Sequence, residues 1–332
     1  MKIKKLHIQN YKSLVNLEII EPNPFTVFAG SNGAGKSNIF EALEYFNFTE
    51  KLKTTALPTI LGNPKEILSY KATNNTIALE VFDHPLHGLR IDIKIDIENN
   101  YKIEQLNHSI VGDVKDYYNT TSTSLLLSEN QSRIFVGNAK LLKINNNDSQ
   151  KLNLDCSNLE LVLKRLLKDI NIKEEILSWL DLLIPGFDNI EIVSEPLSGT
   201  DSLVIYEKGT NKPFTKNLLS DGTWNILALL TAVYQSDEPQ FLCIEEPENG
   251  LNPKVQKELV NLFRQKCEDE DHYIWLNTHS QTIVNQLTPK ELILVDKVDG
   301  ETKIKQLTDS DTSGLSMDEA WLTNTLGGGI PW

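Results

Sequence analysis

The sequence has few cysteines, and none of them are paired. Cys156, Cys243 and Cys267 are its only cysteines and lie far apart. Disulfide frameworks and structural zinc sites need cysteines in pairs or at ligand spacing, so we expect neither. No apolar run is long enough to cross a bilayer, and polar residues between positions 7 and 10 interrupt the stretch that a secretory signal would need. We therefore expect a cytoplasmic protein without membrane association.

Arginine is scarce and the charge balance is acidic. The formal net charge is −14, and the only arginines are Arg90, Arg133, Arg165 and Arg264. A surface that binds nucleic acid over its whole extent needs clustered Lys or Arg, so such a surface is not expected, although a local basic groove stays open. The 332 residues, 40% of them hydrophobic, predict one large globular lobe or two closely joined ones.

Hydrophobic patterning indicates strands and one helix in the first part of the chain. Residues 3–28 predict three short strands, and apolar positions recur at helical spacing from Ser37 to Phe48. The high content of Asn, Ser, Thr and Asp over residues 110–150 predicts loops or an insertion. Alternating apolar and polar residues predict half-buried antiparallel strands at 76–82, 89–97 and 101–106.

The second part begins with a predicted helical lobe and continues with alternating elements. Helical periodicity over residues 159–183 ends at Pro185-Gly186, and a strand pair follows near 190–193 and 203–206. Strands and helices that then alternate predict a parallel sheet covered by helices. These elements are helix 223–235, strand 240–245, helix 253–267, strand 273–277, helix 280–287 and strand 291–296.

These patterns divide the chain into four parts. They are an N-terminal half at 1–110, an insertion and helical lobe at 111–218, a C-terminal half at 219–308 and a tail at 309–332. Within the tail, residues 326–332 are expected to be flexible, with docking of the terminal Trp332 on a partner as the alternative.

The first candidate site is a glycine-rich loop between a predicted strand and a predicted helix. Its glycines allow backbone N–H groups to point at phosphate oxygens, beside the positive end of the helix. Lys36 is predicted to neutralise the β and γ phosphates and Ser37 to ligate magnesium. The setting disfavours a chance match to the phosphate-loop pattern. The predicted ATP contacts are Gly30, Ser31, Asn32, Gly33, Ala34, Gly35, Lys36, Ser37 and Asn38.

The second candidate site is an apolar strand, residues 241–245, that ends in two acids. Ligands bind at the carboxyl ends of strands in open α/β sheets. Glu245 is predicted to hold magnesium through water, and Glu246 to polarise the attacking water. Adjacent strand residues point opposite ways, so both acids serve one site only where the backbone turns, and Pro247 predicts that turn. Taken alone, the pair is also compatible with solvated carboxylates at a strand end.

Two further loops are predicted at the same edge of the sheet. Residues 248–253 follow the acidic pair, and residues 277–280 cap the next predicted strand. With these motifs, the chain resembles the ABC-type ATPase superfamily, and within it the RecF-like and overcoming-lysogenization-defect-like "AAA" ATPases of prokaryotes. The resemblance covers nearly the whole chain. It implies an α/β P-loop NTPase fold: an ABC ATPase head with a mixed central sheet, an antiparallel β edge and a helical lobe.

The resemblance also implies roles for particular residues. Asn249, Gly250 and Leu251 match the D-loop, and His279 matches the switch histidine that contacts the γ phosphate, which makes His279 catalytic together with Glu246 and Lys36. From the local sequence alone, His279 is also explained as a neighbour of a helix cap at Ser280.

The resemblance identifies a signature motif at Ser220, Asp221, Gly222 and Thr223, which would bind the nucleotide of another protomer. Without the resemblance, an ordinary helix N-cap is the favoured explanation. The motif departs from the transporter form, with Asp221 where glycine is usual and Thr223 where glutamine is usual. Glu245 likewise stands where many relatives carry Asp.

Other candidates are less distinctive. Lys12 and Ser13 resemble a loop that helps to hold the nucleotide in RecF-like ATPases, but a solvated hairpin turn is an equally good account. Gln105 and Gln131 are both candidates for the Q-loop glutamine, and their flanks do not decide between them. His84 and His87 are spaced as a pair of metal ligands could be, but no third ligand follows at suitable spacing. A surface turn is therefore favoured.

The resemblance implies a soluble ATPase, with ATP as substrate and Mg²⁺ as cofactor, that forms a head-to-tail homodimer on ATP. It would regulate a separate effector chain, such as a nuclease, in prokaryotic antiphage defence. The alternative is a RecF-like DNA-binding ATPase in DNA repair or maintenance, which the acidic charge and scarce arginine weigh against. A third alternative, the motor subunit of a transporter, is weakened by the form of the signature.

Overall fold

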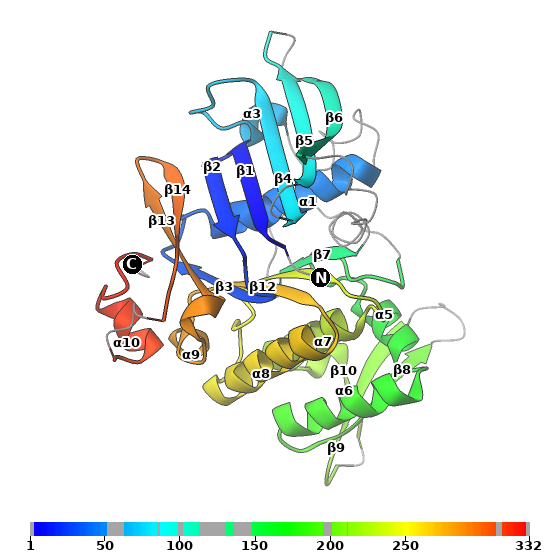
Figure 1. Cartoon of the computed structure of the whole chain (residues 1–332). Helices are drawn as coiled ribbons and strands as arrows, with labels where there is room; N and C mark the ends of the chain where they lie inside the picture. The colour runs from blue at the N-terminus through cyan, green and yellow to red at the C-terminus, as the bar shows by residue number, and fades with distance from the viewer. Residues whose placement is uncertain are drawn as a thin grey trace.

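Three β-sheets organise the chain, with helices packed between and beside them (Figure 1). The computed structural model describes residues 3–51, 63–84, 87–98, 102–112, 130–135, 148–194, 201–210, 212–309 and 314–329. The helices are α1 (Lys36–Lys51), α3 (Pro64–Ile67), α5 (Leu159–Leu166), α6 (Ile170–Leu183), α7 (Asp221–Tyr234), α8 (Pro253–Asp269), α9 (Gln281–Val284) and α10 (Met317–Leu322), with short 3-10 turns η2 (Lys216–Leu218) and η3 (Pro289–Glu291).

The central sheet has six strands in the order β14-β13-β3-β12-β11-β7. Strands β13, β3, β12, β11 and β7 pair in parallel, and β14 joins the edge antiparallel to β13. The predicted mixed sheet of an α/β fold is therefore confirmed. The strands are β3 (Phe25–Gly30), β7 (Gln131–Phe135), β11 (Phe241–Glu245), β12 (Tyr273–Thr278), β13 (Leu292–Val298) and β14 (Glu301–Gln306).

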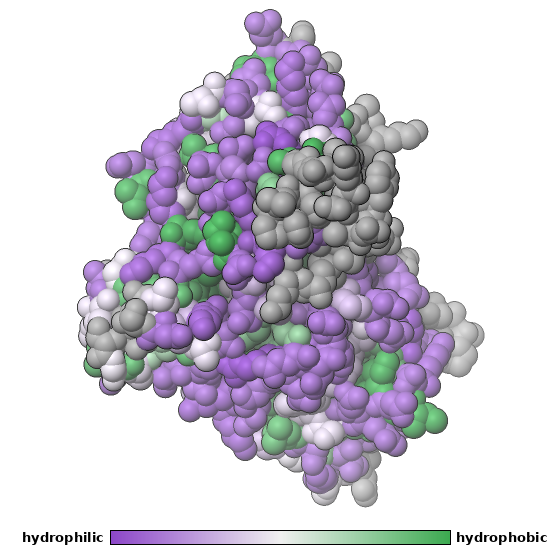
Figure 2. Space-filling view, viewed as in Figure 1, coloured by the Kyte–Doolittle hydropathy of each residue, from purple (hydrophilic) through white to green (hydrophobic). Residues whose placement is uncertain are grey.

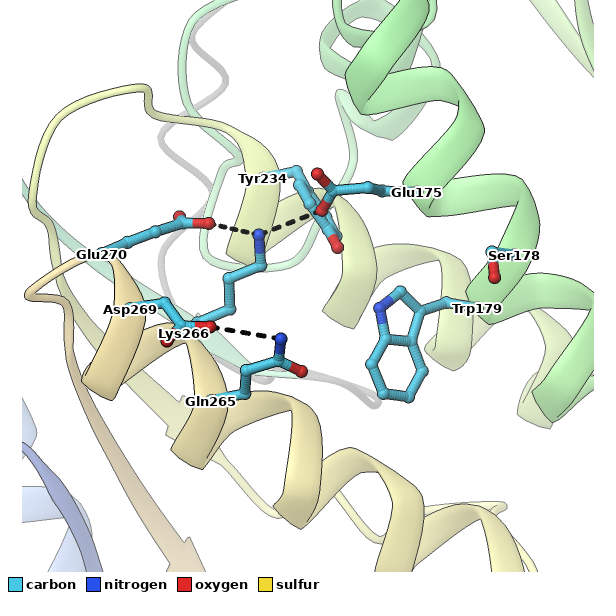
Figure 3. Close-up of a pocket in the computed structure, with 8 residues that line it drawn as sticks. All are labelled: Glu175, Ser178, Trp179, Tyr234, Gln265, Lys266, Asp269 and Glu270. Carbon is cyan, nitrogen blue, oxygen red and sulfur yellow. Dashed lines mark hydrogen bonds and ion pairs between the residues drawn. The ribbon is translucent and has the colours of Figure 1, made fainter.

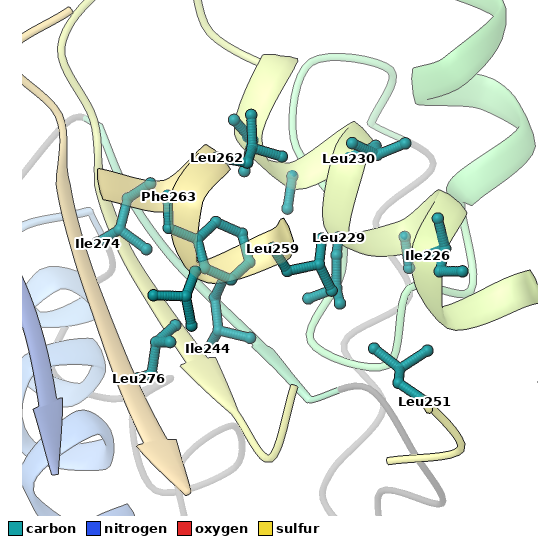
Figure 4. Close-up of a cluster of buried hydrophobic side chains, with 14 of the residues drawn as sticks. Ile226, Leu229, Leu230, Ile244, Leu251, Leu259, Leu262, Phe263, Ile274 and Leu276 are labelled. Carbon is teal, nitrogen blue, oxygen red and sulfur yellow. The ribbon is translucent and has the colours of Figure 1, made fainter. Parts of the chain in front are cut away.

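Helices cover both faces of the central sheet, which explains why β3, β11 and β12 are buried along their whole length. Successive side chains of β11 alternate between the faces. Leu242 and Ile244 pack into the cluster of α7 and α8, whereas Phe241 and Cys243 pack into the cluster that contains α1. Figure 4 shows the first cluster, where side chains of the sheet meet those of both helices.

A second, antiparallel sheet lies on the other side of α1, in the order β2-β1-β4-β5-β6. It is joined to the central sheet at β14, where the Gln306 side chain exchanges hydrogen bonds with the backbone of Ile20 over 2.8 and 2.7 Å. This sheet is the predicted antiparallel edge. Its strands are β1 (Lys5–Tyr11), β2 (Leu14–Ile20), β4 (Thr76–His84), β5 (His87–Asp96) and β6 (Lys102–Gly112).

The predicted lobe contains strands as well as helices. Helices α5 and α6 pack with a three-stranded sheet formed by β8 (Phe187–Ser194), β9 (Asp201–Glu207) and β10 (Phe214–Thr215). The single helical segment predicted over 159–183 is two helices. Asp169 begins the second one, because its carboxylate accepts hydrogen bonds from the N–H groups of Asn171 and Ile172.

Two further predictions were wrong. The stretch 110–150, predicted as loops or an insertion, contains β7, which pairs in parallel with β11 and completes the central sheet. In the segment 326–332 predicted to be flexible, Leu326 is fully buried and the Gly329 N–H donates to Asp296 over 2.8 Å. Before it, residues 317–322 form α10, and Trp321 is fully buried with its indole N–H donating to the Gly329 carbonyl. Residues 330–332 lie outside the described residues, as do the side chains at positions 84 and 87.

The face seen in Figure 2 is mainly hydrophilic, with hydrophobic residues scattered over it. In the described ranges, no helix is both long and apolar enough to cross a membrane.

Replacing Trp321 with alanine should lower the free energy of unfolding by about 3–5 kcal/mol, because a large buried side chain is lost and a cavity remains. Urea denaturation followed by circular dichroism measures this loss. Leu315→Ala is the matched control, since Leu315 lies in the same segment but is 42% exposed. A loss below about 1 kcal/mol for Trp321→Ala would mean that the segment contributes little to stability.

Candidate nucleotide site

The glycine-rich loop connects β3 to α1, as predicted, and the packing around it leaves no room for a side chain at Gly30 or Gly35. Gly35 has φ +104°, and a Cβ at this position would lie 1.9 Å from the Thr302 hydroxyl and 2.8 Å from that of Ser13. A Cβ on Gly30 would lie 2.0 Å from the Val295 carbonyl oxygen. The loop is therefore packed tightly against β13, β14 and the turn that carries Ser13.

A network of hydrogen bonds between buried hydroxyl groups supports the loop. The Thr302 hydroxyl donates to the Ala34 carbonyl over 2.8 Å and lies 2.6 Å from the Ser13 hydroxyl. Asn38 donates to Ser13 over 2.7 Å. Ser13 and Asn38, which we predicted as ATP contacts, thus brace the loop in this structure. Sequence reasoning missed Thr302, because it lies in β14 and no motif marks it.

Lys36 lies inside the loop. Its ammonium donates to the carbonyls of Gly30 and Ser31 over 2.9 and 3.0 Å. Burial lowers the pKa of Lys36 to about 8, although Glu246, Glu248 and Glu245 oppose that shift. A buried cation held by loop carbonyls and surrounded by acids is suited to neutralise phosphate charge.

Ser37 and Glu245, the two predicted magnesium ligands, are in direct contact. The Ser37 hydroxyl donates to Glu245 Oε2 over 2.5 Å, and the Asn277 amide donates to the same oxygen over 3.0 Å. Within the described part of the chain, no cluster of three or more His, Cys, Asp and Glu side chains could hold a metal ion. A hydroxyl and a carboxylate fit Mg²⁺, which keeps water and phosphate oxygens as its other ligands.

The second oxygen of Glu245 is bound by a residue that sequence reasoning did not assign. Arg133 Nε donates to Glu245 Oε1 over 2.6 Å, and Nη2 contacts the same oxygen. Arg133 also donates to Glu44 of α1 over 2.8 Å. Burial raises the pKa of Glu44, an effect that Arg133 partly offsets.

The backbone turns at Glu246 itself rather than at Pro247. Glu246 has φ +48°, and its N–H donates to the Asn277 carbonyl over 3.0 Å. Its side chain accepts from Asn249 over 3.1 Å and lies 3.9 Å from His279 Nε2. The side chains of the two acids therefore have different hydrogen-bond partners in the protein.

His279 is placed beside the loop by Glu248. Glu248 Oε1 accepts hydrogen bonds from the Thr278 hydroxyl and the His279 N–H, both over 2.7 Å. Burial and the neighbouring Lys36 lower the pKa of His279, against the effect of Glu246 and of a hydrogen bond to the Gly30 backbone. Burial raises the pKa of Glu248. The local prediction also holds, because Ser280 caps α9.

The predicted signature turn packs on the predicted D-loop of the same chain. A Cβ on Gly222 would lie 2.5 Å from the Gly250 carbonyl, and Asn225 donates to the Asn249 carbonyl over 2.6 Å. Ser220 caps α7 by accepting from the Thr223 N–H over 3.1 Å. Asp221 is in the first turn and Leu251 is buried. This arrangement agrees with an N-cap and leaves the role in a second protomer a prediction.

The remaining candidates are Lys12, Gln105 and Gln131. Lys12 pairs with an acid of α1, and the two glutamines lie away from the phosphate loop. Lys12, with φ +49°, forms an ion pair with Glu41 of α1. Gln105 is exposed on β6, in the antiparallel sheet. Gln131 begins β7, at the end of the parallel sheet opposite to Glu245, and accepts from Asn47 over 3.1 Å. Neither glutamine therefore lies at the carboxyl edge of the sheet.

A cavity of about 320 Å³ lies between α6 and α8, near the start of β12 and so at the opposite edge of the sheet (Figure 3). Lys266 bridges Glu175 and Glu270 over 3.3 and 2.5 Å, and its ammonium lies 4.1 Å from the centre of the Tyr234 ring. The cavity contains none of the predicted site residues. The ion pair between Lys266 and Glu175 connects the lobe to α8.

Known proteins with sequences similar to this chain include RecF proteins and a phosphatase. "DNA replication and repair protein RecF" of Clostridium botulinum is 29% identical over 126 residues, which are 37% of this chain and 33% of RecF. RecF of Clostridium perfringens is 28% identical over 225 residues, 65% of this chain and 59% of RecF. An "ATP/GTP phosphatase" of Helicobacter pylori is 22% identical over 331 residues, 86% and 87% of the two chains. The chain thus spans only part of the RecF proteins.

Solved structures with a similar fold include SMC head domains. The "SmcHead bound to the C-winged helix domain of ScpA" has a TM-score of 0.62 at 16% identity, over 95% of this chain and 100% of the other. The "SMC head domain from Thermotoga maritima" has a TM-score of 0.53 at 14% identity, over 93% and 100%. At these identities the likeness shows the fold, which is that of an ABC-type ATPase head.

Residues 25–285 match the family described as "AAA domain, putative AbiEii toxin, Type IV TA system". Because this match covers more than half of the chain, the protein belongs to that family, within the RecF-like AAA ATPase group.

Proposed function

We propose that the protein binds and hydrolyses ATP with Mg²⁺ and that ATP closes two copies head to tail. The contact that carries this proposal is the 2.5 Å hydrogen bond between Ser37, in the phosphate loop, and Glu245, at the end of β11. It joins the predicted phosphate and magnesium sites within one chain. Glu246 and His279 lie at the same edge, 3.9 Å apart, where the γ phosphate would be.

Each residue would have a separate task in hydrolysis. Lys36 and the loop N–H groups would hold the phosphates, and Ser37 and Glu245 would hold magnesium, which would neutralise the charge of the β and γ phosphates. Glu246 would accept a proton from the attacking water. His279 would donate a hydrogen bond to the γ phosphate from a position that Glu248 fixes.

The signature turn would complete the site of a second copy. Ser220 and the N–H groups that begin α7 form a positive helix end, and α7 is long enough to present one. The D-loop packs against this turn, so the two motifs would reach a partner together. A nucleotide between two such chains would be held by both, which couples ATP binding to dimerisation.

We further propose that the dimer regulates a separate effector chain, such as a nuclease, in prokaryotic antiphage defence. The family description, which names a toxin and a toxin–antitoxin system, supports a role with a second component. Pull-down of the full chain followed by mass spectrometry would identify that component.

Glu246→Gln should bind ATP but hydrolyse it about 100-fold more slowly, because the group that accepts the proton is lost. The variant should therefore accumulate as a dimer, with twice the apo mass in light scattering with ATP and Mg²⁺. Lys36→Ala is the control: without the loop cation it should neither bind ATP nor change in mass. A Glu246→Gln protein that holds ATP yet stays at its apo mass would contradict the head-to-tail dimer.

Ser220→Arg should retain ATP binding and lose most of its hydrolysis, because the arginine would fill the space for a partner's nucleotide without touching the chain's own phosphate loop. Binding and turnover are measured separately on the same preparation. Mixing it with Lys36→Ala gives a sharper test, since such a pair can form one site with an intact loop and an intact signature. Turnover of Ser220→Arg at the unmodified rate would rule out a role across protomers.

A RecF-like DNA-binding ATPase is the second candidate, supported by the RecF relatives. Titration with duplex DNA at several salt concentrations separates the two functions. For the favoured function we expect weak binding and no stimulation of ATP hydrolysis, given the net charge of −14. A steep fall of affinity with salt, together with DNA-stimulated hydrolysis, would favour the RecF-like function instead.

A further inference from the structure

Arg133 lies below the phosphate site, between the central sheet and α1. On β7 it pairs in register with Cys243 of β11, two residues before Glu245. Side chains two residues apart on a strand share a face, so Cys243 and Glu245 both point towards α1. The Arg133 side chain is only 3% exposed. The guanidinium of Arg133 is thus buried inside the helix–sheet interface.

Helix α1 presents a polar stripe to this guanidinium. Ser37, Glu41 and Glu44 are spaced by four and three residues, which places them on one side of the helix. Arg133 donates to Glu44 over 2.8 Å, and its Nη2 lies 3.6 Å from Glu41. The stripe runs from the predicted magnesium ligand, Ser37, to the acids that Arg133 contacts.

The two carboxylate oxygens of Glu245 have different hydrogen-bond partners. Arg133 directs Nε and Nη2 to Oε1, whereas Oε2 accepts from Ser37 and from Asn277. Oε1 is thereby bound to the scaffold, and Oε2 is directed at the phosphate loop. A planar guanidinium suits this task, because its N–H groups have a fixed geometry that a lysine ammonium lacks.

We propose that Arg133 is a positioning residue for magnesium: it orients Glu245 so that Oε2 faces the metal beside Ser37. This inference rests on the proposed ATP and magnesium site. A buried ion pair stabilises a fold little compared with apolar packing. We therefore test the orientation of Glu245 rather than a contribution of Arg133 to stability. Partners that orient a metal ligand typically change metal affinity by about 10- to 100-fold when they are replaced.

The test measures binding of a fluorescent ATP analogue, first in EDTA and then during titration with Mg²⁺. Arg133→Lys keeps the charge but cannot reach Glu245 and Glu44 with a fixed fork. We expect its affinity in EDTA to stay within about twofold and its half-saturating Mg²⁺ concentration to rise by about tenfold. Arg133→Met should show a larger rise. Thermal melting of each variant reports folding independently of the ligand.

Matched variants separate this role from general loss of an arginine or of an ion pair. Arg165→Lys removes a guanidinium whose hydrogen bonds go to the backbone carbonyls of Ser149, Gln150 and Gln235. Glu44→Gln removes the charge of the other Arg133 partner and leaves the Glu245 contact in place. Both should keep the Mg²⁺ dependence of the unmodified protein.

A double-mutant cycle gives the decisive comparison. If Arg133 acts through Glu245, then Arg133→Lys should have little further effect on Mg²⁺ dependence in a Glu245→Gln background. Additive effects, or a lowered melting temperature with unchanged Mg²⁺ dependence in Arg133→Lys, would overturn the inference. Absence of Mg²⁺-dependent nucleotide binding in the unmodified protein would instead contradict the proposed function itself.

Discussion

The parallel pairing of β3, β12 and β11 is the constraint on which the rest of the structure depends. Parallel strands end at a common edge, so the segments that follow them in three distant parts of the sequence meet there. Ser37 and Glu245 are 208 residues apart in the chain and yet share a hydrogen bond. Asn277, from the strand between them, donates to Glu245 and accepts from the Glu246 N–H. The middle strand therefore fixes the spacing of the two acids from the loop.

Burial of charge at this edge explains why so many of its groups are bound to each other. Lys36, Arg133 and Glu245 are each at most 6% exposed. Removing one partner from a buried pair typically costs about 3–5 kcal/mol, because the other charge stays uncompensated. These charged groups are bound to one another and to the backbone: Lys36 by loop carbonyls, and Glu245 by Arg133 and Ser37. Phosphates would have to replace the carbonyl contacts of Lys36, and a metal ion would have to separate Ser37 from Glu245.

The sequence revealed the parts of this site that are local in the chain. The glycine loop, the acidic pair and the alternation of strands with helices are each visible within a few residues, so the mixed sheet and its edge were predictable. Arg133 and Thr302 were not. Their partners Glu245 and Ala34 lie 112 and 268 residues away. Strand β7 was not predicted either, because it begins with the polar residues Gln131-Ser132-Arg133. These residues are buried only because β7 lies against β11 and α1. By contrast, the start of α6 is marked locally by Asp169, an N-cap residue, which hydrophobic periodicity alone does not detect.

The contact between Gly222 and Gly250 suggests how a second subunit would act on the acidic pair. Gly250 lies in the D-loop, and the preceding residue, Asn249, is held on both sides: its carbonyl accepts from Asn225 of α7, and its amide donates to Glu246. Asn249 therefore connects α7 through two hydrogen bonds to the carboxylate proposed to activate water. In the proposed dimer, the helix that touches the partner's nucleotide and the acid that acts on the chain's own nucleotide would be mechanically linked. The two sites would then respond to each other without a long pathway between them.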